Sequence, residues 1–306
     1  MRRELIEASE LLRSGDPEAV EQAIGLLQST VYSFSMKMCG HREDAEDTMQ
    51  DVLFRSLRHL DRLPDPNALA AWLYTVTRNR CRRMRRTHSE PTIKAISLDE
   101  MMPDWAELQQ LAQQPSSPEN HAIDAQQHQL LHQAVLRLPA PFRIVLVLHD
   151  MEELKTEQVA QILGLQTGTV RVRLHRARLA VRKRMGQLLN GQATQVPRGH
   201  QALKSSAAFE RRPMPTRECR EMFANLSEYL DDRLEPATRE QIQRHIQACP
   251  NCVTFLQDLR KAIDRCNSLD VKCDPDIATR MRKLFAREYL RIVGLLDSAA
   301  PALSGH

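Results

Sequence analysis

The chain has 306 residues, which is long for one domain and typical of two or three. Hydrophobic residues make up 42% and charged residues 27% of the sequence, while glycine and aromatic residues are scarce, a composition that favours helices over sheets. Because the net charge is only +4, the overall charge does not indicate a partner, and the positions of the arginines matter more.

The first residues, MRRELIEASE, contain no apolar run, which predicts that there is no secretory signal peptide. Uninterrupted apolar runs are short: ALAAWLY at 68–74 and the aliphatic run at 144–148 both fall far short of the roughly 18–20 residues needed to cross a bilayer. We therefore expect a cytoplasmic protein without membrane contact. In that reducing compartment, the seven cysteines are better interpreted as metal ligands, reactive thiols or core residues than as disulfides.

Helical patterns begin at Asp16 and Pro17, where Asp caps a helix and Pro occupies its first turn. Apolar residues then recur at three and four positions, the period of an amphipathic helix. They are Val20, Ile24, Leu27, Val31 and Phe34. A second amphipathic helix is predicted after Gly40. Its apolar face consists of Ala45, Met49, Val52, Leu53 and Leu57, and its polar face of Asp44, Glu46, Asp47, Gln50 and Asp51.

A third helix, AAWLYTVTRNRCRRMRR, begins with an apolar side around Trp72 and Leu73 and continues with six arginines and no acidic residue. An arginine run alone usually indicates a solvated face, whereas aromatic residues at the head of the helix favour nucleic-acid binding. The periodicity is lost over 87–120, which contains four prolines, and again from 191 to 213. Both stretches are predicted linkers, the first extended and the second flexible.

Residues 156–185, TEQVAQILGLQTGTVRVRLHRARLAVRKRM, have the pattern of a helix-turn-helix. Thr156 begins the first helix, Gly164 makes the turn and Thr167 begins the second helix. The apolar side of the second helix consists of Val170, Leu174, Ala177 and Val181. Its other sides carry seven cations, with no acidic residue from 166 to 190. This is typical of a recognition helix, whose first side chains contact base edges while neighbouring cations bind phosphates.

From about Asp16 to Leu189, the sequence resembles a bacterial RNA polymerase sigma factor of the extracytoplasmic-function (ECF) group. The resemblance lies in AEDTMQDVLFRSLRHL, AAWLYTVTRNRCRRMRR and GTVRVRLHRAR, in that order, and covers both domains that such factors keep. It implies core RNA polymerase and promoter DNA as partners. No nucleophile elbow, phosphate-binding glycine loop or carboxylate pair indicates an enzyme, so we expect the polymerase to perform the chemistry.

The resemblance also implies three sets of functional residues. The polymerase contacts would be Asp47, Gln50 and Asp51; the -10 element contacts Arg78, Asn79, Arg80, Arg82 and Arg83; and the -35 element contacts Thr167, Thr169, Arg171, Arg173 and Arg176. The acidic set has the alternative of a plain solvated helix face. For Arg178 and Arg182, two interpretations stay open: they bind phosphates, or they are solvated.

The stretch HIQACPNC, 245–252, places one histidine and two cysteines at a spacing of H-x3-C-x2-C. His245 and Cys249 lie one turn apart on a helix, and Cys252 lies just past the helix end. A closed structural zinc site needs four ligands, and Cys219 on the preceding predicted helix is the natural fourth. Imidazole and thiolate together suit Zn²⁺. The alternatives are a core histidine and a dithiol redox pair.

Residues from about Arg217 to Leu259 resemble the zinc-binding anti-sigma domain, whose members carry the same spacing with an upstream ligand. In that family the domain binds between the two sigma domains and hides their polymerase-binding surfaces. The resemblance therefore implies an intramolecular contact between the zinc domain and the sigma domains. It continues more loosely through DIATRMRKLFAREYLRIV, an amphipathic helix. The apolar stripe of this helix is either partner-facing or internal core: Ile277, Met281, Leu284, Phe285 and Ile292.

Together these patterns predict an all-α protein. Its parts would be sigma region 2 at 1–90, an extended linker at 91–122, sigma region 4 with the helix-turn-helix at 123–190, a flexible linker at 191–213 and a zinc-binding anti-sigma-like domain at 214–306. The leading hypothesis is a transcription initiation factor regulated in cis by its zinc domain. One alternative is a stand-alone helix-turn-helix regulator with a structural zinc domain. Another is a redox sensor in which oxidation of Cys219 with Cys249 or Cys252 expels zinc.

Overall fold

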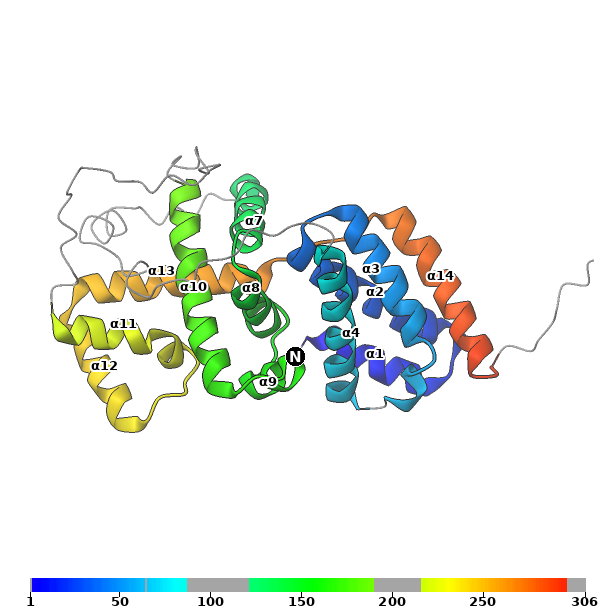
Figure 1. The fold of residues 1–306 in the computed structure, drawn as a ribbon, viewed down its shortest axis with the longest axis horizontal. Helices are drawn as coiled ribbons and strands as arrows, with labels where there is room; N and C mark the ends of the chain where they lie inside the picture. The colour runs from blue at the N-terminus through cyan, green and yellow to red at the C-terminus, as the bar shows by residue number, and fades with distance from the viewer. Residues whose placement is uncertain (1, 64, 87–120, 190–215, 296–306) are drawn as a thin grey trace, which may run out of the picture. The chain divides into compact units, whose positions relative to one another are not determined.

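The structure of the protein is a computed structural model that describes residues 2–63, 65–86, 121–189 and 216–295. Within these ranges the chain is helical and contains no strand, which confirms the predicted all-α class. The predicted linkers at 91–122 and 191–213 lie outside the described residues, apart from 121 and 122. Contacts divide the chain into two units, whose helices carry the labels of Figure 1. None of the described helices is both long and apolar enough for a membrane span.

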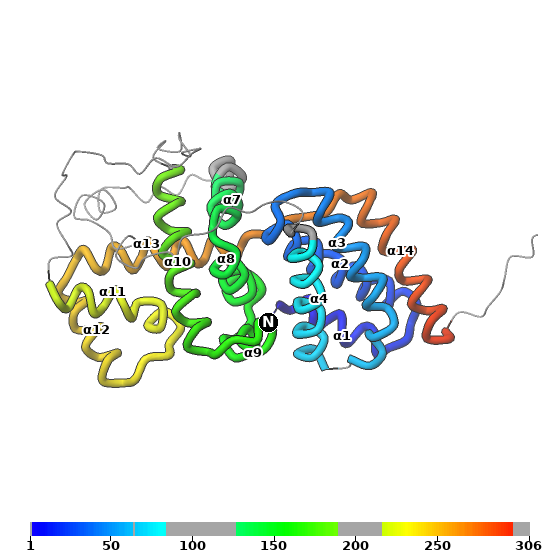
Figure 2. Tube along the Cα trace, in the orientation of Figure 1, coloured from blue at the N-terminus to red at the C-terminus, as the bar shows by residue number. Residues whose placement is uncertain are grey.

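Unit 1 comprises Met1–Thr92, Glu152–Leu165 and Asp270–His306. Its helices are α1 (Arg3–Ser14), α2 (Pro17–Cys39), α3 (Arg42–Ser56), the 3-10 turn η1 (Leu60–Arg62), α4 (Pro66–Arg86), α9 (Thr156–Leu163) and α14 (Pro275–Ile292). Helices α1 to α4 pack together, and α14 lies along α2 and α3 (Figures 1 and 2). A helix from the end of the sequence therefore completes a bundle that the first 86 residues begin.

The amphipathic patterns of α2 and α3 account for this bundle. Asp16 caps α2, because its Oδ2 accepts a hydrogen bond of 2.9 Å from the backbone N–H of Ala19. The predicted apolar positions of both helices are at most 1% exposed: Val20, Ile24, Leu27, Val31, Phe34, Ala45, Met49, Val52, Leu53 and Leu57. Burial of these side chains holds the first helices together.

A buried carboxylate, Glu152, lies inside unit 1. Its Oε1 accepts a hydrogen bond of 3.0 Å from Nζ of Lys37, and both side chains are fully buried. Its Oε2 accepts a 2.7 Å hydrogen bond from the hydroxyl of Tyr74 and lies 3.1 Å from Nε of Arg2. Burial lowers the pKa of Lys37, although the attraction of Glu152 opposes that shift. These contacts fix the start of the 152–165 segment against α2 and α4.

Unit 2 comprises Ile93–Met151 and Gln166–Leu269. Its helices are α7 (His121–Leu136), α8 (Ala140–Leu146), the π-helical turn η2 (Val147–Met151), α10 (Thr167–Leu189), α11 (Arg217–Leu230), α12 (Pro236–Ala248) and α13 (Pro250–Ser268). Helix α10 packs against α7 and α8 and also against α11 and α13. The predicted apolar side of α10 is buried: Val170, Leu174, Ala177 and Val181.

Replacing Glu152 by alanine should destabilise unit 1 strongly. Removing one partner of a buried ion pair leaves uncompensated charge and costs about 3–5 kcal/mol. We expect the unfolding transition of the full chain to move down by about 10 °C in differential scanning calorimetry. The control is Glu157→Ala, because Glu157 is exposed on the same segment. Equal melting temperatures for the two variants would contradict the stabilising role of Glu152.

Candidate functional site

Four side chains that can bind a metal converge where α11, α12 and α13 meet. The ligand atoms of Cys219, His245, Cys249 and Cys252 all lie within 4.8 Å of one another. Nε2 of His245 is 3.4 Å from Sγ of Cys219 and 3.2 Å from Sγ of Cys252. In a tetrahedral zinc site, nitrogen and sulfur ligands are about 3.6 Å apart, as follows from metal–ligand bonds of about 2.1 and 2.3 Å. The structure thus brings the four predicted ligands together at distances that fit a tetrahedral ion.

Local hydrogen bonds position these ligands. Thr216 caps α11, because its hydroxyl oxygen accepts a 3.2 Å hydrogen bond from the backbone N–H of Cys219, which sets that cysteine in the first turn. The backbone N–H of Cys249 donates to the carbonyl of His245 over 2.9 Å and ends α12. Pro250 then begins α13, so Cys252 lies in the first turn of a new helix. The prediction that Cys252 follows the end of the histidine-bearing helix is therefore confirmed.

The surroundings of the four ligands favour a structural metal. Cys219 and Cys252 are 1% and 0% exposed, and His245 and Cys249 are half-buried. Four protein ligands would fill the coordination shell of a tetrahedral ion and leave no position for a substrate. Burial and the neighbouring Cys219 raise the pKa of the Cys252 thiol, and a bound cation would reverse this effect by stabilising the thiolate. A carboxylate oxygen of Glu218 lies 3.6 Å from Nδ1 of His245, where it can orient the imidazole ring.

The apolar core around this cluster includes a residue from α10. Its buried members are Leu179, Cys219, Met222, Phe223, Leu226, Ile242, Cys252, Phe255, Leu256 and Leu259. Leu179 is 1% exposed and is the member contributed by α10, whereas the others belong to α11, α12 and α13. The small helical region that carries the metal ligands therefore shares its core with the second helix of the predicted helix-turn-helix.

Leu179 belongs to a stripe on α10 that faces α11 and α13. We call His175, Arg178, Leu179 and Arg182 the docking stripe; they are spaced at three and four residues and share one side of the helix. The ring of His175 meets Phe223 edge-on, with centroids 6.0 Å apart. The guanidinium of Arg182 lies over the ring of Phe255 at 4.2 Å, and its Nε donates to Asp258 over 2.8 Å.

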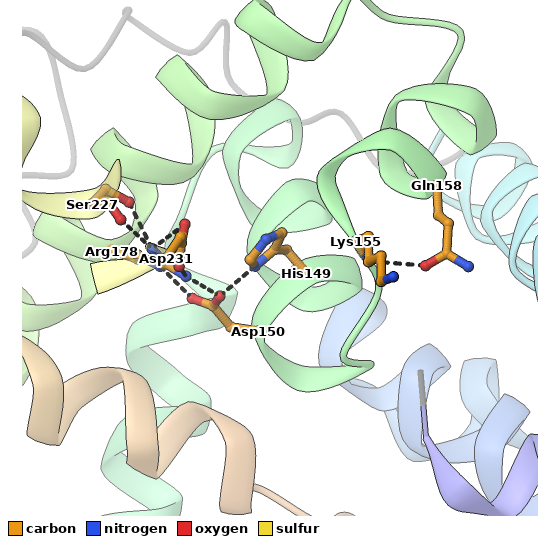
Figure 3. A network of polar contacts seen from close by, with 7 residues as sticks. All are labelled: His149, Asp150, Lys155, Gln158, Arg178, Ser227 and Asp231. Atoms are coloured by element: carbon orange, nitrogen blue, oxygen red, sulfur yellow. Dashed lines mark hydrogen bonds and ion pairs between the residues drawn. The ribbon is translucent and has the colours of Figure 1, made fainter. Parts of the chain in front are cut away.

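Arg178 lies at the centre of the polar contacts in the docking stripe (Figure 3). Its guanidinium donates to both carboxylate oxygens of Asp150, at 2.8 and 2.6 Å, and to both of Asp231, at 2.9 and 2.8 Å. It also donates to the hydroxyl of Ser227 over 2.7 Å. Asp150 follows α8 in η2, whereas Ser227 and Asp231 lie in and just after α11. One arginine thus connects two parts of unit 2.

The charges of this network stabilise one another. Burial alone would raise the pKa of Asp150, but Arg178 and His149 lower it to about 2. Burial would likewise lower the pKa of Arg178, and the two carboxylates instead raise it above its usual value. The interpretation that Arg178 and Arg182 are solvated is wrong, whereas phosphate binding by these residues stays a prediction. Both are buried, at 3% and 4% exposure, and paired with acidic side chains.

The predicted -35 contacts lie on α10, mostly on sides other than the docking stripe. Thr167 begins the helix as expected, and the turn before it has Gly164 at φ 64°, a left-handed conformation that favours glycine. The five residues are each half-buried: Thr167, Thr169, Arg171, Arg173 and Arg176. Thr169, Arg173 and Arg176 lie on the side away from the docking stripe, whereas Arg171, four residues before His175, shares its side.

The predicted polymerase contacts lie on α3. Asp47 and Gln50 are exposed, whereas Asp51 is half-buried and forms ion pairs with Arg55 at 2.9 Å and with Arg80 at 3.2 Å. The sequence interpretation missed Phe54, which is 56% exposed four residues after Gln50. The sequence could have indicated this exposure, because Phe54 lies outside the apolar stripe of α3. Phe54 adds an apolar side chain to this acidic surface.

The predicted -10 contacts lie on α4. Three of them, Asn79, Arg82 and Arg83, are exposed. Arg78 and Arg80 are half-buried, and Arg78 donates a 2.6 Å hydrogen bond to the carbonyl of Ile162. Burial and the like charge of Arg82 lower the pKa of Arg78.

The predicted stripe of α14 is only partly on its packed side. Phe285 is buried, and Ile277 and Met281 are half-buried, but Leu284 and Ile292 are 59% and 40% exposed. The packed side also contains Ala286, Tyr289 and Leu290. Leu284 and Ile292 therefore do not face the other helices of unit 1, because both lie away from the middle of the packed side of α14.

Two polar contacts align α14 with α2 and α3. Arg282 forms an ion pair with Glu21 at 3.3 Å, and Asp274 accepts from Arg42 over 3.2 Å. Gly25 makes room for the first pair, because a Cβ at that position would lie 2.9 Å from Cδ of Arg282. The missing side chain on α2 thus lets the arginine of α14 lie across it.

Comparisons with known families agree with these features. Residues 24–90 match the family described as Sigma-70 region 2, residues 128–181 match Sigma-70, region 4, and residues 219–252 match the family described as "Putative zinc-finger". The chain therefore carries regions 2 and 4 of a sigma factor followed by a zinc-finger segment. This confirms the resemblance that the sequence motifs indicated.

Two curated relatives are sigma factors. The ECF RNA polymerase sigma factor SigW of Bacillus subtilis is 26% identical over 179 residues, which cover 58% of this chain and 94% of that protein. The ECF RNA polymerase sigma factor SigE of Mycolicibacterium smegmatis is 30% identical over 152 residues, covering 50% of this chain and 56% of that protein. A co-crystal structure of the sigma factor RpoE with the anti-sigma factor NepR from Bartonella quintana covers 53% of this chain and 92% of that chain, at 21% identity and a TM-score of 0.37.

The metal cluster predicts one zinc ion for each chain. We expect Cys252→Ser to lose this ion, because it removes one of four ligands from a closed site. Metal content measured by mass spectrometry should fall from about one zinc to near zero. The matched control is Cys273→Ser, since Cys273 lies outside the cluster and should leave the metal in place. Full zinc content in the Cys252 variant would contradict the assignment.

The burial of His175 predicts that acid weakens the contact between the docking stripe and α11. Burial, followed by the charges of Arg178 and Arg176, lowers the pKa of His175 from 6.5 to about 4, so the packed state favours the neutral ring. Stability from this residue is fully present above about pH 6.5 and is lost as the pH falls toward 4. Going from pH 7 to pH 5 should favour separation of α10 from α11 by about 20-fold.

Amide hydrogen exchange in α11, corrected for the intrinsic effect of pH, measures this separation. The variant His175→Gln keeps the metal cluster but cannot gain a proton at this position. It should therefore show a smaller acid effect than the natural chain. The same pH dependence in both proteins would exclude His175 as the cause.

Proposed function

We propose that this protein is an ECF-type sigma factor that directs core RNA polymerase to promoters in the cytoplasm and is inhibited in cis by its zinc-binding tail. The tail is 214–306, and the sigma regions are 1–90 and 123–190, joined by linkers at 91–122 and 191–213. The observation that carries cis regulation is Arg178. A guanidinium on the region 4 helix is shared between Asp150 of region 4 and Asp231 of the tail.

Zinc is the metal that we assign to the tail. Three thiolates and one imidazole in a closed cluster are the donor set of a structural zinc site. Bound zinc would fasten α11 to α12 and α13, which share a small core and position Ser227, Asp231 and Asp258 against α10. The ion would therefore act on the inhibitor surface and not on nucleic acid or polymerase directly.

The tail has one contact surface for each sigma region. Helices α11 and α13 pack against α10, and α14 packs against α2 and α3. Asp47, Gln50 and Phe54 remain exposed on α3, so α14 does not cover the assigned polymerase contacts themselves. The packing therefore does not support inhibition by covering of these three side chains.

The short connection between α13 and α14 provides a different reason for inhibition. Only six residues, 269–274, connect α13 to α14, and this connection spans at most about 25 Å. The -10 and -35 elements are, by their numbering, about 25 base pairs apart, which is roughly 85 Å at 3.4 Å per base pair. If regions 2 and 4 each bind their own element, the tail is too short to keep both of its contacts. Promoter binding and full tail binding therefore compete.

The assigned residues follow from this function. Asp47, Gln50 and Asp51 would contact polymerase, and Phe54 would add an apolar contact beside them. The -10 element would be bound through Arg78, Asn79, Arg80, Arg82 and Arg83, and the -35 element through Thr167, Thr169, Arg171, Arg173 and Arg176. Single-strand capture at the -10 element needs cations for the backbone, and the exposed arginines of α4 supply them.

A stand-alone DNA-binding regulator is not favoured, because the chain matches sigma region 2 in addition to region 4. Redox control through Cys219, Cys249 and Cys252 stays a prediction. Loss of zinc after mild peroxide, together with increased transcription, would support it. Zinc retained at unchanged activity would contradict it.

Run-off transcription with core polymerase tests the proposed function. The full chain should direct initiation at a selected promoter, and a chain ending at Gly191 should do so more strongly. No initiation with either protein would contradict the sigma assignment. Equal initiation with both would contradict cis inhibition and leave the sigma assignment intact.

Two substitutions in the tail should relieve inhibition without changing either sigma region. Asp231→Asn and Asp258→Asn weaken the charged hydrogen bonds to Arg178 and Arg182, each worth about 1.5–3 kcal/mol. Because both carboxylates are partly exposed, we expect the double variant to increase run-off transcription by about tenfold, less than the sum of the two bonds. Asp264→Asn is the matched control, since Asp264 is exposed on the same helix as Asp258. An increase with Asp264→Asn as large as with the double variant would show a nonspecific charge effect.

A further inference from the structure

Val172 is the one large apolar side chain that is exposed among the described residues of unit 2, at 52%. It lies on α10 between Arg171 and Arg173, where the other outward residues are polar or glycine. A β-branched residue loses side-chain freedom in a helix, so helix formation does not favour valine here. Burial does not favour valine either, because this side chain is 52% exposed. Neither folding requirement therefore accounts for an apolar residue at this position.

The direction of Val172 is set by the helix period. At about 100° per residue, it points opposite to the buried side that contains Val170 and Leu174. Thr169 and Arg176 lie three residues before it and four residues after it, so they share its face. Both belong to the residues assigned to the -35 element. Val172 thus lies in the middle of the surface that a recognition helix presents to the major groove.

Gly168 provides a second observation on this face. It precedes Val172 by one turn, and a Cβ added there would meet no atom within 4 Å. The fold therefore does not require glycine at this position, although glycine weakens a helix. The absence of a side chain lets another molecule approach the backbone of α10 closely, directly beside Val172.

We propose that Val172 contacts the C5 methyl group of a thymine in the major groove of the -35 element, with Gly168 allowing the close approach. Thymine is the base that presents a methyl group in the major groove, and apolar side chains recognise it. The arginines on either side supply attraction to phosphates, which carries no sequence information itself. This inference rests on the proposed promoter function and adds a base preference that the polar residues alone do not give.

The test uses the full chain bound to core polymerase. Duplexes with a randomised -35 region are first selected for binding. Each thymine of the enriched sequence is then replaced by 2′-deoxyuridine, which removes only the methyl group. For the natural protein, we expect one such replacement to weaken binding about fourfold, the effect of burying one methyl group. Val172→Ala should bind the unmodified duplex more weakly and should no longer distinguish thymine from uracil at that position.

Two further variants separate this contact from effects on folding. Ile6→Ala removes an exposed apolar side chain of α1 and should keep the full methyl preference. Gly168→Ala should raise the melting temperature, because alanine favours the helix, and yet weaken binding to the selected duplex. Unchanged DNA affinity of Gly168→Ala would overturn the close approach.

The outcomes distinguish this inference from the function on which it rests. If the selection enriches a sequence but no uracil replacement changes binding, or if Val172→Ala keeps the same methyl preference, the contact is wrong and the promoter function stands. If the selection enriches no sequence at all, the proposed function fails and this inference fails with it.

Discussion

The buried guanidinium of Arg178 is the interaction on which the arrangement of unit 2 depends. A cation at 3% exposure is stable only when charge and hydrogen bonds compensate its lost hydration, and Asp150 and Asp231 supply both. Asp150 alone keeps the arginine paired inside region 4. The second carboxylate and Ser227 come from the tail, so the tail completes a network that region 4 begins.

Helix α10 carries three sets of side chains with different chemistry. Its apolar side holds the helix in region 4, the docking stripe contacts the tail along the second half of the helix, and the exposed Val172 lies on the first half. Val172 and Leu179 are seven residues apart and share a side of the helix, as do Arg171 and His175. Because one helix carries all three sets, its position couples them. In the proposed function, the contact with the tail would act on promoter binding by holding this helix in place.

Local patterns predicted much of this molecule because they depend on helix geometry. The buried sides of α2, α3 and α10 follow the 3.6-residue period, and the H-x3-C-x2-C spacing indicated three of the four side chains that converge in the candidate metal site. The pairing of Arg178 could not be predicted, because its partners lie 28 and 53 residues away. Glu152 is similar, since it pairs with Lys37 across 115 residues. A charged residue is expected at the surface unless its distant partner is known. For α14, the sequence did not show which side of the helix is buried, because both sides contain apolar residues.

Leu179 is synthesised before the helices whose core it completes. Helix α10 leaves the ribosome before α11, α12 and α13, so the residue that completes the core of the metal-binding helices is already in place when they emerge. The same helices made as a separate protein would lack this side chain and would leave apolar surface around Phe223 and Phe255 open to water. Fusion in one chain thus provides a folding template in addition to a high local concentration.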